Sequence, residues 1–160
     1  MRWSEIGEQR CPVARSLSVV GDRWTLLVLR EAFLRTRRFE EFQERTGAPR
    51  AVLADRLRAL VADGVLVRRT SDERGGRPEY RLTEKGIDLY PVLVALVGWG
   101  DRWMGDGQGP PVELRHRGCG TVMVPELACP ECGDWVTARD VEAHRSLEPA
   151  LTPPGGDRNA

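Results

Sequence analysis

The sequence has no long hydrophobic run. Its longest apolar stretches, Leu26–Leu29 and Pro91–Val97, are flanked by charged residues and fall far short of the roughly 20 residues that cross a bilayer. The first eleven residues, MRWSEIGEQRC, contain no apolar segment of the kind that a secretory signal requires. We therefore expect a cytoplasmic protein that contacts no membrane.

The chain also has little of what most enzymes use. Both of its histidines lie near the C-terminus, and it has neither a glycine-rich loop for phosphates nor a Ser/His/Asp set. Enzyme activity is therefore not expected. With 160 residues, of which 41% are hydrophobic, the chain can form one domain with its own core and a small appendage.

Lysine is nearly missing, since Lys85 is the only one and arginine supplies the rest of the 24 basic side chains. The 24 acidic side chains make the net charge zero, but the charges are unevenly distributed. Residues 1–104 carry 19 basic and 15 acidic side chains, whereas residues 105–160 carry 5 and 9. A basic N-terminal part with an acidic C-terminal part is compatible with nucleic-acid binding.

A stretch rich in glycine and proline, residues 105–111, predicts a linker, because it has no apolar periodicity and marks the change of charge sign. It separates a predicted domain of residues 1–104 from a small predicted module at 112–147. Residues 148–160 cannot bury apolar surface and predict a disordered tail.

Helical periodicity dominates the first 104 residues. It predicts two helices separated by Gly21, a short helix at 38–46 and a longer one at 49–63 that Gly64 ends in the left-handed conformation. The apolar stripe of the longer helix consists of Val52, Leu53, Leu57, Leu60 and Val61.

The period then changes from 3.6 to 2. Residues 65–67 and 79–82 predict two strands joined by the charged loop 71–78. A last helix follows Thr83, which can cap it, and Pro91 is expected to kink or split that helix.

This order of elements predicts a winged helix-turn-helix, which is a mainly α fold with a small β-hairpin wing (α+β). In such a fold the second helix of the pair reads the major groove and the hairpin loop meets phosphates. Asp55 would repel phosphate, so it either pairs with Arg58 or Arg56 or faces a cytosine amino group. Each hairpin arginine could instead be simply solvated. The candidate DNA contacts are Arg50, Ala51, Ala54 and Arg58 on the helix and Arg68, Arg74 and Arg77 on the hairpin.

Several motifs occur in register: CPV at 11–13, then G-x-R-W-x-L-x-V-L-R, R-R-F-x-E-F, L-x-x-R-L-R-x-L-x-x-D-G and E-Y-x-L-T-x-x-G. Together they resemble the HxlR family of bacterial transcription regulators, over about Cys11–Trp103. The resemblance implies a cytoplasmic homodimer that binds a palindromic double-stranded DNA operator. Many relatives have Ser and Lys where this chain has Pro49, Arg50 and Ala51, so no operator sequence is implied.

The last helix carries an apolar stripe too large for a small three-helix body to cover. The stripe could pack within the chain, against the first helix around Leu17 and Val20. The resemblance favours an interface between two copies. The candidate dimerisation residues are Leu17, Leu89, Leu93, Leu96, Trp99 and Trp103.

Cys11 stands alone, directly before Pro12 and the first helix. A helix N-terminus and the nearby Arg10 and Arg15 would favour its reactive thiolate form. The HxlR family includes sensors of oxidants and electrophiles that use a cysteine in this region, so Cys11 is a candidate redox residue. It could equally be a small, partly buried hydrophobic residue.

The other three cysteines lie in two short motifs, H-R-G-C-G and C-P-E-C-G. Each has the spacing of a zinc knuckle, and together they predict a zinc-ribbon-like module with a structural zinc site. The predicted ligands are His116, Cys119, Cys129 and Cys132. His144 is the rival fourth ligand. A Cys129–Cys132 disulfide and a ribbon without metal are the alternatives.

We therefore expect a dimeric transcription regulator that responds to redox chemistry or to a small effector. The alternative is a protein-interaction adaptor that uses a winged helix and a zinc ribbon without specific DNA binding. Salt-dependent, sequence-selective DNA binding separates the two, because an adaptor shows neither property.

Overall fold

The structure is a computed structural model, and it describes residues 3–70, 76–105, 107–109, 112–124 and 126–144. The chain forms two compact units. The first ends at Tyr90, and the second runs from Pro91 to Ser146. The predicted domain at 1–104 and module at 112–147 stay predictions. The predicted tail, part of the predicted linker and Arg74 lie outside the described residues. No helix in the described ranges is long and apolar enough to cross a membrane.

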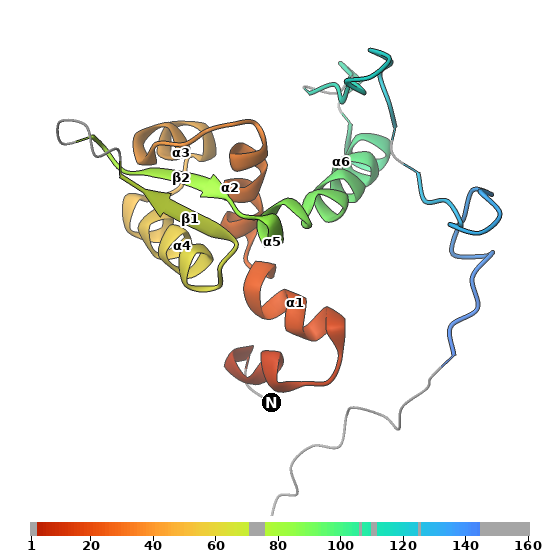
Figure 1. Ribbon diagram of the computed structural model, residues 1–160, viewed down its shortest axis with the longest axis horizontal. Helices are drawn as coiled ribbons and strands as arrows, with labels where there is room; N and C mark the ends of the chain where they lie inside the picture. Colours follow the sequence, from red (N-terminus) through yellow and green to blue (C-terminus); the bar gives the residue numbers. More distant parts are fainter. Residues whose placement is uncertain (1–2, 71–75, 106, 110–111, 125, 145–160) are drawn as a thin grey trace, which may run out of the picture. The chain divides into compact units, whose positions relative to one another are not determined.

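The described elements are short helices and one hairpin. In chain order they are η1 (Trp3–Glu8, a 3-10 helix), α1 (Pro12–Val20), α2 (Arg23–Phe33), α3 (Phe39–Thr46), α4 (Arg50–Ala62), β1 (Leu66–Arg69), β2 (Glu79–Leu82), α5 (Glu84–Ile87) and α6 (Tyr90–Met104) (Figure 1).

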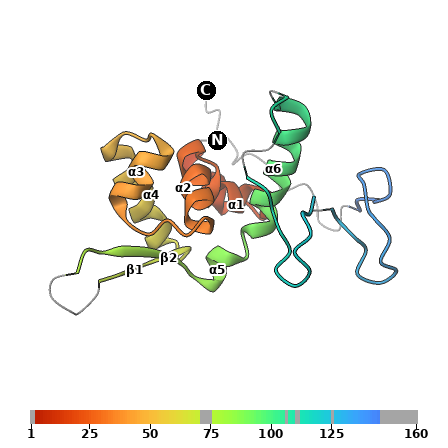
Figure 2. The ribbon, with the colours of Figure 1, turned by 90° about the horizontal axis from the view of Figure 1, so that it is seen from above.

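The two strands form the predicted hairpin. They pair antiparallel, with Leu66 opposite Leu82 and Arg69 opposite Glu79. In the views of Figures 1 and 2 the hairpin extends away from the helices, and α4 lies beside it. The arrangement α3–turn–α4 followed by this hairpin confirms the predicted winged helix-turn-helix.

Local signals set the ends of the helices. Asp22 precedes α2 and accepts hydrogen bonds from the N–H groups of Trp24 and Thr25, at 2.9 and 3.2 Å. Gly47 ends α3 at a φ of 69°, in the left-handed region that favours glycine. Thr83 caps α5, because its Oγ1 accepts the N–H of Gly86 at 3.1 Å.

Some details differ from the sequence-based expectation. Pro49 is the residue before α4 and not its first residue. The first strand begins at Leu66 and continues to Arg69, because it follows the register of its partner strand. The helix η1 was not expected. The predicted split near Pro91 is confirmed, since α5 ends at Ile87 and α6 begins at Tyr90.

The core of the first unit lies between α2, α3, α4 and the start of the hairpin. Its largest fully buried side chains are Val28, Leu29, Phe42, Leu53, Leu57, Leu60, Val65 and Leu66. The predicted stripe of the 49–63 helix is therefore buried at its three leucines. The ring of Tyr80 on β2 meets Phe42 edge-on, with 6.4 Å between ring centroids, and so joins the wing to α3.

Gly86 is required by a close approach of two backbone segments. It is buried in α5, and a Cβ there would collide with the carbonyl oxygen of Val65. This contact holds α5 against the residue where α4 leads into the hairpin. It also explains the last glycine of the motif E-Y-x-L-T-x-x-G.

Candidate nucleic-acid interface

The helix α4 has a buried face and an exposed face. Leu53 and Leu57 are fully buried. The predicted contacts Arg50, Ala51 and Arg58 are exposed, and Ala54 is half-buried. Ala51 and Arg58 lie on the side of α4 away from the leucines, whereas Arg50 is exposed because it starts the helix, on the flank toward α3.

Arg50 is held in place by the preceding helix. Its guanidinium carbon lies 4.7 Å from the centroid of the Phe39 ring, and its Nη1 lies 3.5 Å from Oε1 of Gln43. Both partners belong to α3, and the stacking is a cation–π contact. Arg50 therefore starts α4 with its side chain directed back over α3, at the helix end that enters the groove in this fold.

Asp55 pairs with Arg58, which was one of the predicted alternatives. The Nη2 of Arg58 lies 2.7 Å from Oδ1 of Asp55, and both side chains are more than half exposed. An exposed pair of this kind contributes little stability. Arg58 can therefore leave Asp55 for a base edge or a phosphate at small cost.

Arg56 has a different role, which sequence reasoning missed. Its Nη1 lies 4.0 Å from Oδ2 of Asp22, and its Nε is buried without a hydrogen-bond partner. Asp22 therefore both caps α2 and attracts a cation on α4. This contact links the candidate recognition helix to the start of α2. The sequence signal was Asp22 directly after Gly21 and before an apolar helix, which is a capping pattern.

A buried charge lies on α2 near the start of α3, and sequence reasoning missed it too. The carboxylate of Glu31 is 5% exposed and lies 2.7 Å from Nη2 of Arg30 and 4.0 Å from Nη1 of Arg45. The hydroxyl of Thr36 donates to it at 3.4 Å. Buried carboxylates need such partners, so this cluster fixes α2 relative to α3.

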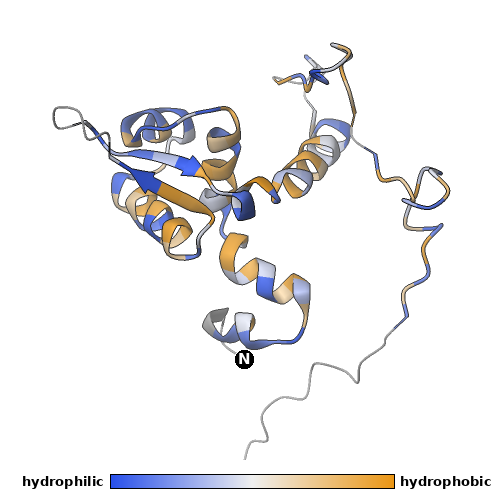
Figure 3. Cartoon of the chain, in the orientation of Figure 1, coloured by the Kyte–Doolittle hydropathy of each residue, from blue (hydrophilic) through white to orange (hydrophobic). Residues whose placement is uncertain are grey.

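The wing carries exposed arginines. The predicted contacts Arg68 and Arg77 are exposed, as is Arg69, whereas Arg74 lies outside the described residues. β1 is hydrophobic at its start and hydrophilic toward the wing loop (Figure 3). Sequence reasoning missed Arg81 on β2, which is exposed and pairs with Glu79 at 2.9 Å.

The last helix carries an exposed apolar face. Val92, Leu96, Trp99 and Trp103 follow one another at spacings of four, three and four, which places them on one side of α6. Trp99 is 58% exposed and Trp103 66%. Of the other predicted dimerisation residues, Leu17 on α1 is also exposed, whereas Leu89 and Leu93 are half-buried.

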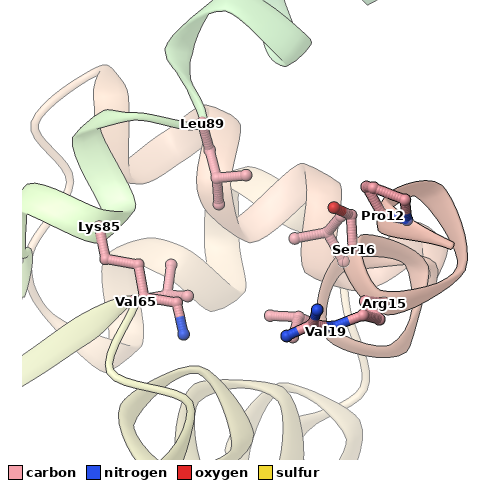
Figure 4. A pocket seen from close by; sticks show the side chains of 8 residues that line it. Pro12, Arg15, Ser16, Val19, Val65, Lys85 and Leu89 are labelled. Atoms are coloured by element: carbon pink, nitrogen blue, oxygen red, sulfur yellow. The ribbon is translucent and has the colours of Figure 1, made fainter. Parts of the chain in front are cut away.

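A pocket of about 400 Å³ lies beside α1 in the first unit (Figure 4). Its apolar lining comes from α1 and from the residues that flank α4 and α5, and two cationic side chains, Arg15 and Lys85, also line it. The Nζ of Lys85 donates to the carbonyl oxygen of Asp63 at 2.7 Å. Pockets of this size hold small molecules, and the two cations suit an anionic group.

Cys11 directly precedes Pro12, which is one of the residues that line this pocket. Cys11 is the residue before α1, is half-buried and accepts the N–H of Arg15 through its carbonyl oxygen at 3.0 Å. Its sulfur makes no capping hydrogen bond. The thiol is therefore free at a helix N-terminus.

The predicted zinc ligands lie in two exposed loops, one at 116–120 and one at 129–133. The hydroxyl and the N–H of Thr121, and then His116, lower the pKa of Cys119 to about 7. The N–H groups of Cys132 and Glu131 lower the pKa of Cys129. In the described residues no three His, Cys, Asp or Glu side chains converge on one point. The structure thus brings each pair together but not the two pairs, and the zinc site stays a prediction.

An exposed arginine face on the second helix of a helix-turn-helix, next to a basic wing, defines a DNA-binding protein. The comparisons with known proteins agree. The HxlR-like helix-turn-helix family matches residues 19–108. Rv3095 of Mycobacterium tuberculosis, described as an uncharacterised HTH-type transcriptional regulator, is 47% identical over 129 residues, which are 81% of this chain and 82% of the relative.

Solved structures show the same fold. The crystal structure of PA1607, assigned as a transcription factor, superposes with a TM-score of 0.75 at 39% identity, over 85% of this chain and 95% of the other. The redox regulator HypR in its oxidised form superposes with a TM-score of 0.54 at 31% identity, over 57% of this chain and 96% of the other. The chain belongs to the HxlR-like helix-turn-helix family of transcription regulators.

Removing the carboxylate of Asp22 tests how α4 is held. We expect Asp22→Ala to lower the free energy of unfolding by about 1–2 kcal/mol, because α2 loses its cap and the half-buried Arg56 loses a nearby anion. Chemical denaturation measures this change. The matched control is Asp55→Ala, which removes an exposed carboxylate of α4 and should cost less than about 0.5 kcal/mol. Equal losses for the two variants would contradict the proposed role of Asp22.

Proposed function

We propose that this regulator binds a palindromic operator as a homodimer and controls transcription of a nearby gene in response to an oxidant, an electrophile or a small effector. The observation that carries the proposal is the exposure of two arginines on α4, Arg50 at its first position and Arg58 on the side away from its buried leucines. This helix and the wing beside it are the parts that meet DNA in this fold.

On α4, each exposed residue suits a different part of the groove. Arg50 and Arg58 can donate two hydrogen bonds to a guanine edge. Ala51 and Ala54 between them are small enough for close approach or for contact with a thymine methyl. On the wing, Arg68 and Arg77 have charges that suit phosphates, which position the protein without reading sequence.

The homodimer is supported by the apolar face of α6. Leu96, Trp99 and Trp103 are exposed in the single chain, and a second copy would cover them. A twofold dimer presents two equal recognition helices, so its operator is a palindrome with half-sites about one helical turn apart.

A protein-interaction adaptor remains the second candidate. It would use the same folded surfaces without selecting a DNA sequence. The exposed arginines of α4 and the wing favour DNA, because they cluster on the two elements that contact it. Salt-dependent, sequence-selective binding to the DNA upstream of its own gene separates the two functions.

Two features support a response to a signal. Cys11 is a free, half-buried thiol at the start of α1, and the similar HypR is named as a redox regulator. The pocket beside α1 offers Arg15 and Lys85 to a small anionic effector. Oxidation or binding here would change the position of α1 and, through it, the dimer.

Arginine substitutions test the DNA-reading face. We expect Arg50→Ala and Arg58→Ala each to weaken operator binding by about 1–3 kcal/mol, because each removes a contact to base edges or phosphates. Arg77→Ala should weaken binding to all sequences more evenly and lower the slope of affinity against salt by about one. Fluorescence anisotropy with operator and scrambled duplexes measures both effects.

The control for these variants is Arg139→Ala, which loses the same charge from an exposed position after the linker. It should leave operator affinity unchanged. If the three variants of α4 and the wing bind as tightly as the wild type, the proposed face does not touch DNA. If Arg139→Ala lowers operator affinity as much as these variants do, the affinity depends only on net charge.

A charge on the apolar face of α6 tests the dimer. We expect Trp99→Glu to make the protein monomeric in sedimentation velocity, because burying a carboxylate in an apolar interface is costly. Its affinity for the full palindrome should fall to that for a half-site. Asp101→Lys changes a charge on the opposite side of the same helix and should stay dimeric. A dimeric Trp99→Glu protein would place the interface elsewhere.

Oxidation tests the role of Cys11. We expect a diamide or quinone treatment to change operator affinity by about 5- to 150-fold, the usual range of coupling between two sites. The Cys11→Ser variant should bind the operator normally and lose this response. If Cys11→Ser responds like the wild type, the signal is received at another thiol.

A further inference from the structure

The two loops that carry the C-terminal cysteines are built in the same way. In each, the carbonyl of the first residue accepts the N–H of a glycine four residues later, from Gly120 to His116 at 2.7 Å and from Gly133 to Cys129 at 2.9 Å. Both glycines have a positive φ, 74° and 76°. Each loop forms its own hairpin-shaped turn in Figure 2.

The residues that flank the two turns are also hydrogen-bonded in the same way. The N–H of His116 donates to the carbonyl of Thr121, and that of Cys129 donates to the carbonyl of Asp134, at 2.9 and 2.8 Å. One residue further out, isolated bridges close both loops, Arg115 with Val122 and Ala128 with Trp135. The backbone thus repeats one design at two places where the sequence has an i, i+3 pair of metal-binding side chains.

Within each loop the two candidate ligands lie close together. The Nδ1 of His116 is 3.3 Å from Sγ of Cys119. Gly118 permits this, because a Cβ there would lie 2.9 Å from Cε1 of the His116 ring. In the second loop, Cys129 and Cys132 occupy the positions that His116 and Cys119 hold in the first.

These loops have no core to hold them. Among the described residues of 112–144 none is buried, and large apolar side chains such as Leu127 and Trp135 are 75% and 68% exposed. A segment this small needs a staple other than hydrophobic burial, either a disulfide or a metal. Ligand pairs that lie ready in two loops fit a metal that joins them.

The segment is also shared with relatives. The match to Rv3095 covers 129 residues of this chain, more than the 104 residues that precede the linker, so it extends into this segment. The match to PA1607, over 85% of the chain, does so as well.

We propose that His116, Cys119, Cys129 and Cys132 bind one zinc ion, which draws the two loops together into a closed tetrahedral site. Three thiolates and an imidazole are ligands that zinc prefers. With four protein ligands no position is left for a substrate, so the site is structural. Binding would fold residues 112–144 into one unit, since metal-binding free energy becomes folding free energy in such modules.

His116 is the fourth ligand in this proposal and not His144. His116 occupies the first position of one loop, 3.3 Å from Cys119. His144 lies outside both loops, and its Nε2 lies 3.5 Å from a carboxylate oxygen of Glu142. The proposal does not depend on DNA binding, because it concerns only residues after the linker.

The test is the metal content of the full chain, purified under reducing conditions without a polyhistidine tag. Elemental analysis should find about one zinc per chain. After removal of the zinc, Co²⁺ should produce the visible absorption of a tetrahedral ion and the ultraviolet charge-transfer bands of bound thiolates. Cys119→Ser and Cys129→Ser should lose most of the metal, and His116→Ala should bind it more weakly.

The matched controls are Cys11→Ser and His144→Ala, which should keep the metal. Circular dichroism and melting of the winged helix serve as the folding control, because its core lies in the first unit. A reduced chain that binds neither zinc nor Co²⁺ would overturn the proposal, as would a Cys129–Cys132 disulfide in the isolated protein or full metal content in both cysteine variants. Loss of metal in His144→Ala but not in His116→Ala would overturn the assignment of the fourth ligand.

Discussion

Burial of one face of α4 is the constraint on which the rest of the winged helix depends. Leu53, Leu57 and Leu60 fill the core against α2 and α3, and their spacing of three and four places them on one side of the helix. The opposite side must then face solvent, where it carries Ala51 and Arg58, and Arg50 is exposed because it starts the helix. The same periodicity that stabilises the fold therefore decides which side chains are available to DNA.

The elements of the winged helix could be predicted from sequence because their signals are local. Helical spacing, Gly47 and Gly64 in left-handed turns and the Thr83 cap each act within a few residues. The contacts that orient α4 could not be predicted in this way. Arg56 meets Asp22 from 34 residues away, and Arg50 stacks on Phe39 only after α3 and α4 have packed. Such contacts depend on tertiary geometry, which no local pattern encodes.

The C-terminal segment also has features that could be predicted from sequence and one that could not. The ligand spacing in the sequence pointed to two turns, and the structure has them, with Gly120 and Gly133 where the chain needs a positive φ. Their meeting point could not be predicted, because among the described residues neither apolar burial nor hydrogen bonding joins one loop to the other. A metal would supply that connection. In the winged helix the core holds the arginines in position, whereas in this segment an ion would have to replace the core.

We propose that a twofold dimer reads a palindrome through two copies of α4. Hydroxyl-radical footprinting of the full chain on the DNA upstream of its own gene tests it most directly. We expect two protected half-sites related by twofold symmetry, with centres about one helical turn, or roughly 10 base pairs, apart. A single protected site, or uniform protection that does not depend on sequence, would contradict it.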